Sequence, residues 1–159
     1  MFRRRACAAG GRAAGAKRVA TGLVPGGVYV VVFRLAKERT IQVGCLGRFR
    51  LAAGRYAYVG SAQRGLAKRV ARHARRRKTV RWHVDYLARW ATVEAAYAWP
   101  LPKRAECRLA ARLVADGARR AVPGFGASDC RCPGHLVRLR GPADVTRLRK
   151  NIDTRRGAT

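Results

Sequence analysis

Residues 26–34 have the sequence GGVYVVVFR. Two glycines precede a run of β-branched and aromatic residues whose length is typical of a strand, so we expect a strand over Val28–Arg34. A second stretch of similar character, GRYAYVGSA, occupies residues 54–62 and predicts a strand over Arg55–Gly60. These two runs predict the centre of a compact antiparallel sheet.

The rest of the chain predicts an alternation of short strands and helices around this centre. After Gly65 the apolar residues Leu66, Val70 and Ala74 recur at helical spacing, which predicts a helix as far as Lys78. The same reasoning predicts strands at Arg39–Val43, Arg48–Leu51, Thr92–Trp99 and His135–Arg140, helices at Arg81–Trp90, Lys103–Asp116 and from Pro142 onward, and a loop at Val122–Gly134. We therefore expect an α/β fold in which a small antiparallel sheet of three principal strands is flanked by helices.

The chain length of 159 residues is that of one domain. Residues 1–20 contain six arginines and lysines and no acid, so we predict a disordered basic arm there; an organelle transit peptide has similar chemistry and stays an alternative. We place the single domain at residues 21–152 and a flexible tail at residues 153–159. No stretch approaches the roughly 20 apolar residues of a membrane-spanning helix, which argues against a membrane protein.

The charge of the chain is strongly unbalanced. Lysine and arginine total 36 against 8 acidic residues, giving a formal net charge of +28, and only six of the basic residues are lysines. The positive charges of such a surplus repel one another unless a polyanion binds to the protein. Arginine forms bidentate hydrogen bonds with phosphate and stacks on bases. Nucleic acid is therefore the expected partner. Because alanine and arginine are both abundant, compositional drift remains an alternative cause.

The five cysteines have no spacing typical of a disulfide-rich domain, which favours a reducing compartment, the cytoplasm. Cys130, Cys132 and His135, together with Cys107, could form a Cys3His zinc site. The C-x-C spacing is tighter than the usual C-x2-C, however, and buried free thiols are common core residues, so we favour structural thiols. Trp82, Trp90 and Trp99 are expected in the core.

Two tyrosines occur in strand context, in Gly27-Val28-Tyr29 and in Tyr58-Val59-Gly60. Arg69 and His73, in the helix after the second, are four residues apart and share one face at the margin of the buried side. Such a position can hold a polar group rigidly while it reaches a substrate.

Glu106 falls in the same helical stripe as Leu109, Ala110 and Leu113, the side that should face the core. An unpaired carboxylate there would cost several kcal/mol, so it needs a partner, for which a divalent cation or an arginine would serve. The alternative is that an acid in the first turn of a helix is favoured by the helix dipole and stays in solvent.

The order GVY, YVG, then R-x3-H on the next helix and E at the head of a later helix resembles the GIY-YIG nuclease superfamily over about residues 26–118. The stretches GRYAYVGSA, RWHVDYL and GFGASDCRCPGHL resemble a less-studied branch of it, which is also found attached to archaeal endonuclease III. The sequence departs from the superfamily in the long segment between the two tyrosines and in Ser61, where many relatives carry lysine.

The resemblance implies a role for each matching residue. Tyr29 would orient or deprotonate the attacking water, with Tyr58 as its neighbour across the hairpin, and Arg69 would hold the scissile phosphate. His73 would lie near that phosphate, and Glu106 would bind the divalent metal, Mg²⁺ or Mn²⁺. An unperturbed phenol is a poor base at neutral pH, so we expect the surrounding cations to lower the pKa of Tyr29.

Two further positions match weaker features of the superfamily. His83 falls close to where some homing-type members place a second histidine. Ser128 or Asp129 could take the place of an asparagine that some members carry after the metal carboxylate.

A basic run follows the tyrosine motifs. It predicts a groove that binds the phosphate backbone, although part of it could be only a solvated face. The predicted nucleic-acid contacts are Lys68, Arg72, Arg75, Arg76, Arg77, Lys78 and Arg81.

Together these features predict a metal-dependent endonuclease that hydrolyses phosphodiester bonds, with DNA favoured over RNA. The alternatives are a non-catalytic nucleic-acid-binding module, accessory to repair or to the ribosome, and a compaction protein, which rests on charge alone.

Overall fold

The computed structural model describes residues 19–20 and 24–156 of the chain, and side chains from residue 24 to residue 151. Its main sheet consists of β1 (Val19–Ala20), β2 (Gly27–Leu35), β5 (Gly54–Ala62), β6 (Thr92–Trp99), β7 (Arg119–Arg120) and β8 (Leu136–Arg138). The strand order is β1-β6-β2-β5-β8-β7. The short β1 runs parallel to β6, and every other neighbouring pair in this sheet is antiparallel. The predicted α/β fold with three principal antiparallel strands is confirmed, since β6, β2 and β5 form the centre.

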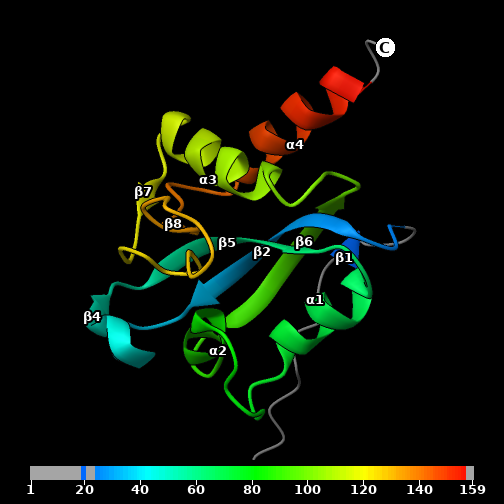
Figure 1. The fold of residues 1–159 in the computed structure, drawn as a ribbon. Coiled ribbons are helices and arrows are strands. Elements are labelled where there is room, and N and C mark those ends of the chain that lie inside the picture. Colours follow the sequence, from blue (N-terminus) through cyan, green and yellow to red (C-terminus); the bar gives the residue numbers. More distant parts are fainter. Residues whose placement is uncertain (1–18, 21–23, 157–159) are drawn as a thin grey trace, which may run out of the picture.

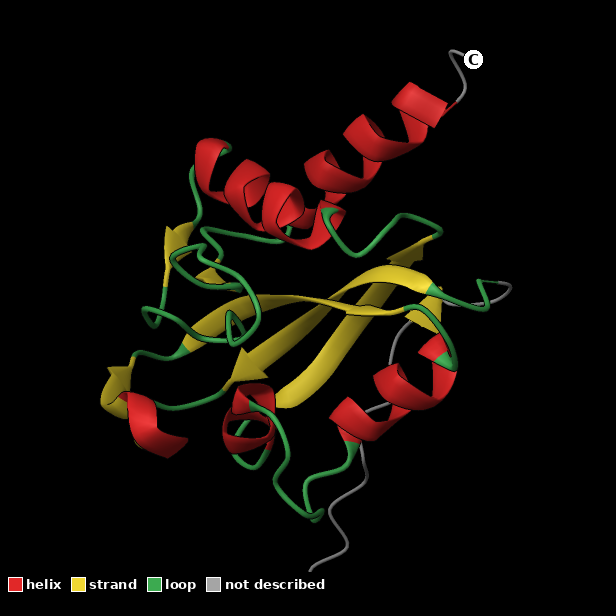
Figure 2. Ribbon diagram, viewed as in Figure 1, coloured by secondary structure: helices red, strands yellow, loops and turns green. Residues whose placement is uncertain are grey.

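Four helices cover the two faces of the sheet (Figures 1 and 2). They are α1 (Leu66–Ala74), α2 (His83–Ala88), α3 (Ala105–Ala115) and α4 (Ala143–Arg156). Helices α1 and α2 lie against one face and α3 lies against the other, where Val145 and Leu148 from the start of α4 join the same core while the rest of α4 extends away from the sheet (Figure 1). The domain therefore has three layers.

The alternation of side chains along β2 explains the two cores. Tyr29, Val31 and Phe33 point to the α1–α2 face, whereas Val28 and Val30 point to the α3–α4 face. All five are at most 2% exposed. A strand buried on both faces reads as a continuous apolar run, which is why residues 28–33 carry no polar residue but the phenol of Tyr29.

The long segment between the two tyrosines contains the two predicted strands, which pair as a separate hairpin. Strands β3 (Arg39–Val43) and β4 (Gly47–Leu51) pair with each other and are joined by a short 3-10 turn, Gly44–Leu46. The hairpin adds Ile41 and Leu51 to the core on the α1–α2 face. It extends that core without interrupting the pairing of β2 with β5.

The free edge of β5 creates the space for a site. Strand β8 pairs with β5 only from Tyr56 to Tyr58, and one further backbone hydrogen bond joins Val59 to His135. In the described part of the chain no strand covers the remaining edge, residues 60–62. Side chains from both faces of the sheet can therefore meet at this edge.

Several predicted boundaries differ from the observed ones. Helix α1 ends at Ala74 rather than Lys78, because Lys78 folds back and its ammonium group donates to the carbonyl oxygens of Arg72 and His73 at the helix end. Helix α2 ends at Ala88 rather than Trp90. That early end leaves Trp90 46% exposed, with the Arg39 guanidinium 4.4 Å from its ring centroid, so its predicted place in the core is wrong.

The ends of the chain bear on the predicted arm and tail. Val19 and Ala20, which we assigned to the arm, form β1. The rest of the predicted arm, residues 1–18, lies outside the described residues, and α4 extends through residues 153–156 of the predicted tail. Within the described residues, no helix combines the length and the apolar character needed to cross a membrane.

Candidate active site

The two tyrosines lie side by side on the α1–α2 face of the sheet. Their ring centroids are 6.4 Å apart, and Tyr29 and Tyr58 are 2% and 7% exposed. Tyr29 is the cross-strand partner of Gly60, and a Cβ atom at Gly60 would lie 2.6 Å from the Tyr29 hydroxyl. Gly60 is therefore required because the phenol of Tyr29 packs directly on the backbone of β5. The two triplets noted in the sequence are thus parts of a single packing unit.

His73 lies behind Tyr29 rather than in the pocket where substrate would bind. It is 1% exposed, and its Nε2 lies 2.8 Å from the Tyr29 hydroxyl. The helical turn carries the imidazole inward against both phenols and Trp82, outside the lining of the pocket, and its place near the phosphate stays a prediction. Burial, assisted by the nearby Lys78, lowers the pKa of His73 to about 3. The imidazole is therefore neutral at physiological pH.

The predicted lowering of the pKa of Tyr29 is also wrong. Burial raises its pKa well above the ordinary value, the neighbouring Tyr58 adds to the increase, and Arg69 opposes it without cancelling it. Burial likewise raises the pKa of Tyr58. Both phenols are therefore neutral hydrogen-bonding groups in the resting protein.

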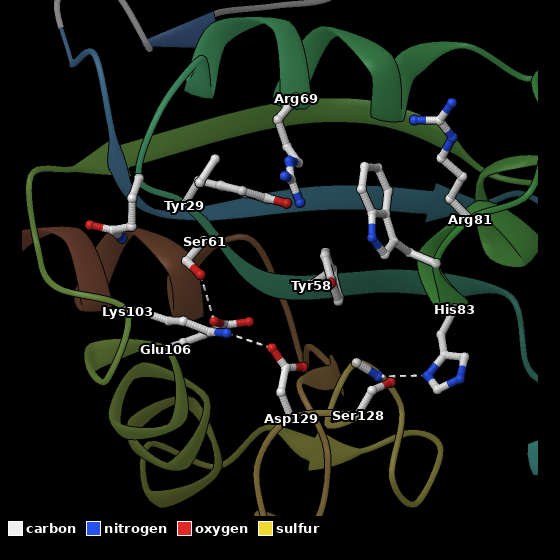
Figure 3. A pocket seen from close by; sticks show the side chains of 14 residues that line it. Tyr29, Tyr58, Ser61, Arg69, Arg81, His83, Lys103, Glu106, Ser128 and Asp129 are labelled. Carbon is white, nitrogen blue, oxygen red and sulfur yellow. Dashed lines mark hydrogen bonds and ion pairs between the residues drawn. The ribbon is translucent and has the colours of Figure 1, made fainter.

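Arg69 reaches the pocket from α1. Its guanidinium carbon lies 4.4 Å from the centroid of the Trp82 ring, and that of Arg72 lies 4.5 Å from the same ring. Stacking on an aromatic face fixes the plane of a guanidinium while its N–H groups stay free to bind an anion. Arg69 is thus a rigid cation at the pocket wall (Figure 3).

Glu106 lies in the first turn of α3 and is 9% exposed. Its Oε2 accepts a hydrogen bond of 2.8 Å from Ser61, and its Oε1 lies 3.2 Å from Nδ1 of His135. The carboxylate thus faces inward, as the helical stripe predicts, but its observed neighbours are a hydroxyl and an imidazole rather than an arginine. Among the described residues Glu106 forms no ion pair with an arginine or a lysine.

These groups share one pocket of about 350 Å³ (Figure 3). The sheet contributes Tyr29, Tyr58 and Ser61, helix α1 contributes Arg69, and helix α3 contributes Glu106. The remaining lining residues are Ala62, Gln63, Arg81, Trp82, His83, Lys103, Gly126, Ser128 and Asp129. Phenols from one face of the sheet and a carboxylate from the other thus meet at the free edge of β5.

His83 lines the pocket and also holds one of its loops. Its Nδ1 accepts a hydrogen bond of 3.0 Å from the backbone N–H of Gly126, and burial lowers its pKa. Because Nδ1 is the acceptor, the proton of the neutral ring is on Nε2. Gly126 has φ +73°, and a Cβ there would lie 2.9 Å from the Tyr58 ring, so only glycine fits between His83 and Tyr58.

The mouth of the pocket carries an ion pair that the sequence analysis did not single out. Lys103 Nζ lies 2.5 Å from Asp129 Oδ2, and both side chains are more than half exposed. Lys103 precedes Glu106 by three residues, and its carbonyl oxygen accepts a hydrogen bond from the Glu106 N–H. This spacing places the two side chains on the same side of the helix start, so the sequence could have indicated Lys103 as a pocket residue. Ser128 and Asp129, the candidates for the asparagine position, both line the pocket.

The basic run divides into two groups. Arg72 and Lys78 bind Asp85, which is fully buried in the first turn of α2, at 2.7 Å and 3.2 Å. These two residues thus serve the fold, and their role as nucleic-acid contacts stays a prediction. The other predicted contacts are exposed: Lys68, Arg75, Arg76, Arg77 and Arg81.

Asp85 has a structural role that we did not predict from the sequence. It also accepts hydrogen bonds from the backbone N–H groups of Arg81 and Trp82, at 2.8 Å and 3.1 Å. Burial opposes ionisation, but these donors and Arg72 outweigh it and lower the pKa of Asp85 to about 2. The signal in the sequence was an acid three residues after the start of a helix pattern, where it can cap the helix.

The fold and the pocket define a small α/β domain with a site made of tyrosine, arginine and carboxylate. The chain belongs to the family described as domain of unknown function DUF123, which matches residues 28–156. No curated protein matches the chain. No solved structure matches it either.

Proposed function

We propose that this protein is a metal-dependent endonuclease of the GIY-YIG superfamily, from the branch also found attached to archaeal endonuclease III, and that it hydrolyses phosphodiester bonds in DNA. One observation carries the proposal: Tyr29, Tyr58, Arg69 and Glu106 are far apart in the sequence and line a single pocket. They come from four different elements, β2, β5, α1 and α3. A common substrate explains their convergence.

The pocket suits a phosphate group. Arg69 is oriented by Trp82, and Arg81 also lines the pocket, while Lys103 lies beside Glu106 and is paired with Asp129. A guanidinium held in place before the reaction stabilises the charge that develops on a non-bridging oxygen without reorganising. Arg69 therefore binds the scissile phosphate in this proposal.

The donors around Glu106 fit a hard divalent cation. The carboxylate of Glu106, the hydroxyl of Ser61 and the carboxylate of Asp129 are oxygen groups on one side of the pocket. Magnesium binds through one or two carboxylates and keeps several of its waters, which this open arrangement permits. Glu106 would hold Mg²⁺ or Mn²⁺, which would supply Lewis-acid charge to the departing 3′ oxygen.

Tyr29 and His73 act as a pair on the attacking water. The neutral phenol of Tyr29 orients that water through its oxygen, and His73 Nε2, 2.8 Å from that oxygen, fixes the direction of the hydroxyl group. Burial disfavours both a phenolate at Tyr29 and an imidazolium at His73, so the two side chains position the attacking water and its proton leaves to solvent.

The exposed basic residues on and after α1 supply a path for the nucleic-acid backbone. Lys68, Arg75, Arg76 and Arg77 are exposed, and Arg81 continues the path into the pocket. Contacts of this kind release counterions, so affinity falls steeply with salt and carries no base specificity.

Cleavage of supercoiled plasmid and of single-stranded DNA, with Mg²⁺ or Mn²⁺ and then with EDTA, tests the proposal. We expect cleavage with metal, none with EDTA, and a loss of about 10²-fold or more in both Glu106→Gln and Arg69→Ala. Glu94→Gln is the matched control. Glu94 lies on β6, outside the pocket, and its carboxylate is paired with Arg55.

Two results would overturn the catalytic proposal. Cleavage that persists in Glu106→Gln would remove the metal site from the mechanism. A wild-type protein that cuts no substrate with either metal but binds DNA with a steep salt dependence would establish the binding module instead. In that case Arg76→Ala should lower the salt slope, whereas Arg147→Ala, at an exposed arginine of α4 on the other face, should leave it unchanged.

A further inference from the structure

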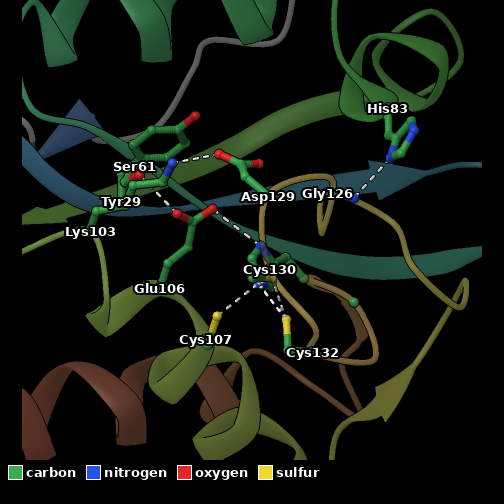
Figure 4. A network of polar contacts seen from close by, with 12 residues as sticks. Tyr29, Ser61, His83, Lys103, Glu106, Cys107, Gly126, Asp129, Cys130 and Cys132 are labelled. Atoms are coloured by element: carbon green, nitrogen blue, oxygen red, sulfur yellow. Dashed lines mark hydrogen bonds and ion pairs between the residues drawn. The ribbon is translucent and has the colours of Figure 1, made fainter.

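Four metal-ligating side chains meet beside the pocket. Cys107 comes from α3, and Cys130, Cys132 and His135 come from the loop that leads into β8. One sulfur or nitrogen atom from each lies within 4.8 Å of the others. Figure 4 shows Cys107, Cys130 and Cys132 grouped below Glu106.

The distances in this cluster match a single ion rather than a disulfide. His135 Nε2 lies 3.6 Å, 3.6 Å and 2.8 Å from the sulfurs of Cys107, Cys130 and Cys132, and the last two sulfurs are 3.1 Å apart. A disulfide would bring two sulfurs to about 2.05 Å. Tetrahedral zinc with bonds of about 2.3 Å to sulfur and 2.0 Å to nitrogen requires ligand atoms about 3.5–3.8 Å apart. The separations present, from 2.8 Å up to 4.8 Å, bracket this range, so small side-chain shifts bring all four atoms around one ion.

The chemistry of the donors selects the metal. Three thiolates and one imidazole form a closed, soft set typical of structural zinc, whereas magnesium prefers oxygen donors such as those around Glu106. An iron–sulfur cluster interposes several irons and sulfides and would keep its ligand atoms farther apart. The strongly basic chain also offsets the net negative charge of a zinc bound by three thiolates.

We propose that Cys107, Cys130, Cys132 and Nε2 of His135 bind a zinc ion, and that this ion fixes the orientation of Glu106 through the other nitrogen of His135. With Nε2 on the metal, the ring proton is on Nδ1, which lies 3.2 Å from Glu106 Oε1. A zinc-bound histidine commonly donates its outer N–H to a carboxylate. In this structure Nδ1 lies at ion-pair distance without the alignment of a hydrogen bond, so zinc binding would turn the ring slightly toward Glu106. The zinc also ties the irregular loop of residues 121–135 to α3, so it holds two walls of the pocket together.

His135 is thus a positioning residue for Glu106, and the zinc site stands independently of the nuclease proposal. The tight C-x-C spacing of Cys130 and Cys132, and the frequency of buried free thiols in protein cores, had favoured structural thiols. The structure brings Cys107, which lies on α3, next to the other three residues. The sequence identified Cys107 as a candidate ligand but did not show that it lies beside them.

Metal analysis of the purified full-length chain tests the site. We expect about one zinc ion per chain in the wild type and in Cys45→Ser, and a loss of most of it in Cys132→Ser. Cys45 is the matched control, because it is an exposed free cysteine outside the cluster. A wild type that contains no zinc and takes up none after reduction overturns the proposal, as does an intact mass showing a Cys130–Cys132 disulfide in the freshly isolated chain.

Cobalt replaces zinc and reports the ligands without any activity assay. We expect the intense charge-transfer and visible bands of tetrahedral Co²⁺ bound to thiolates, stoichiometric in the wild type. Because this measurement uses the wild type, it decides the question even if Cys132→Ser does not fold. Bands typical of octahedral cobalt would overturn the site.

The link to Glu106 has its own spectroscopic readout. Glu106→Gln should shift the visible bands of the cobalt-loaded protein without changing the cobalt stoichiometry, whereas Glu94→Gln should leave the bands unchanged. An unshifted spectrum in Glu106→Gln would show that His135 does not connect the ion to the carboxylate. Zinc binding with no nuclease activity would reject only the proposed function.

Discussion

Two flanks of the pocket each bury one carboxylate and one histidine, but they treat the negative charge in opposite ways. On the α1–α2 flank Asp85 has two cations, Arg72 and Lys78, and two backbone N–H donors. On the α3 flank Glu106 has one hydroxyl and one imidazole nitrogen, and no arginine or lysine is paired with it in the described residues.

This difference separates a structural acid from one that is available to a ligand. A buried carboxylate whose charge is fully balanced by the protein stabilises the fold and offers nothing to a cation. A buried carboxylate that lacks a protein cation keeps its charge for one that arrives from solution. Burial alone would have made Asp85 and Glu106 look equivalent, whereas their partners distinguish them.

The largest effect should follow from breaking the balanced flank. Asp85→Asn leaves Arg72 and Lys78 facing a neutral amide, and it should lower the free energy of unfolding by about 3–5 kcal/mol. Urea denaturation followed by circular dichroism measures the change. Asp129→Asn is the matched control, since its ion pair with Lys103 is exposed and should be worth about 1 kcal/mol or less.

Equal losses in these two variants would contradict the structural role of Asp85. A large loss in Asp85→Asn alone would establish that the charge cluster between α1 and α2 holds the two helices in place. Arg69 and Trp82 depend on that arrangement, so the wall of the pocket should then lose its order as well.

The next effect concerns the histidine of the same flank. The pKa of His73 falls from 6.5 to about 3 on folding, because burial and Lys78 disfavour the imidazolium. Between these values the unfolded chain binds one proton more than the folded protein at this residue, so stability decreases as the pH is lowered through this range. The slope should approach about 1.4 kcal/mol per pH unit, and His73→Gln should remove it while keeping an acceptor for the Tyr29 hydroxyl.

The difference in stability between the wild type and His73→Gln, measured from about pH 6.5 down to pH 4, isolates this contribution, because the shifted pKa values of His83 and His135 affect both proteins alike. The pKa of Asp85 is lowered from 3.8 to about 2, so the stability that its ionisation provides is lost only below about pH 3.8. Parallel curves of stability against pH for the wild type and His73→Gln would contradict a neutral, buried His73.

The fold could be predicted to the extent that its signals are local. The apolar run at residues 28–33, the glycines around the hairpin and the helical spacing after Gly65 each report on their own neighbourhood. The end of α1 could not be predicted in this way. It depends on Lys78, whose side chain returns to the helix because Asp85, on another helix, attracts it.

The candidate site could be predicted as a set of residues but not as a geometry. The resemblance and the helical stripe selected Tyr29, Arg69 and Glu106, which do share a pocket. The same reasoning placed His73 beside the phosphate, whereas the structure places it behind Tyr29, because the direction of a helix against a sheet is a tertiary property. The neighbours of Glu106, Ser61 and His135, also come from distant parts of the chain.

The smallest effect should come from the unbalanced flank. Glu106→Gln keeps an acceptor for the Ser61 hydroxyl and removes a buried charge that no arginine or lysine compensates, so the free energy of unfolding should stay within about 1 kcal/mol of the wild type. Under the proposed function, Mg²⁺ should raise the melting temperature of the wild type and not that of the variant, because a ligand stabilises the state that binds it. Urea and thermal unfolding, each with and without Mg²⁺, measure both quantities. A loss in Glu106→Gln as large as that in Asp85→Asn would show that Glu106 serves the fold, and the contrast between the two flanks would then disappear.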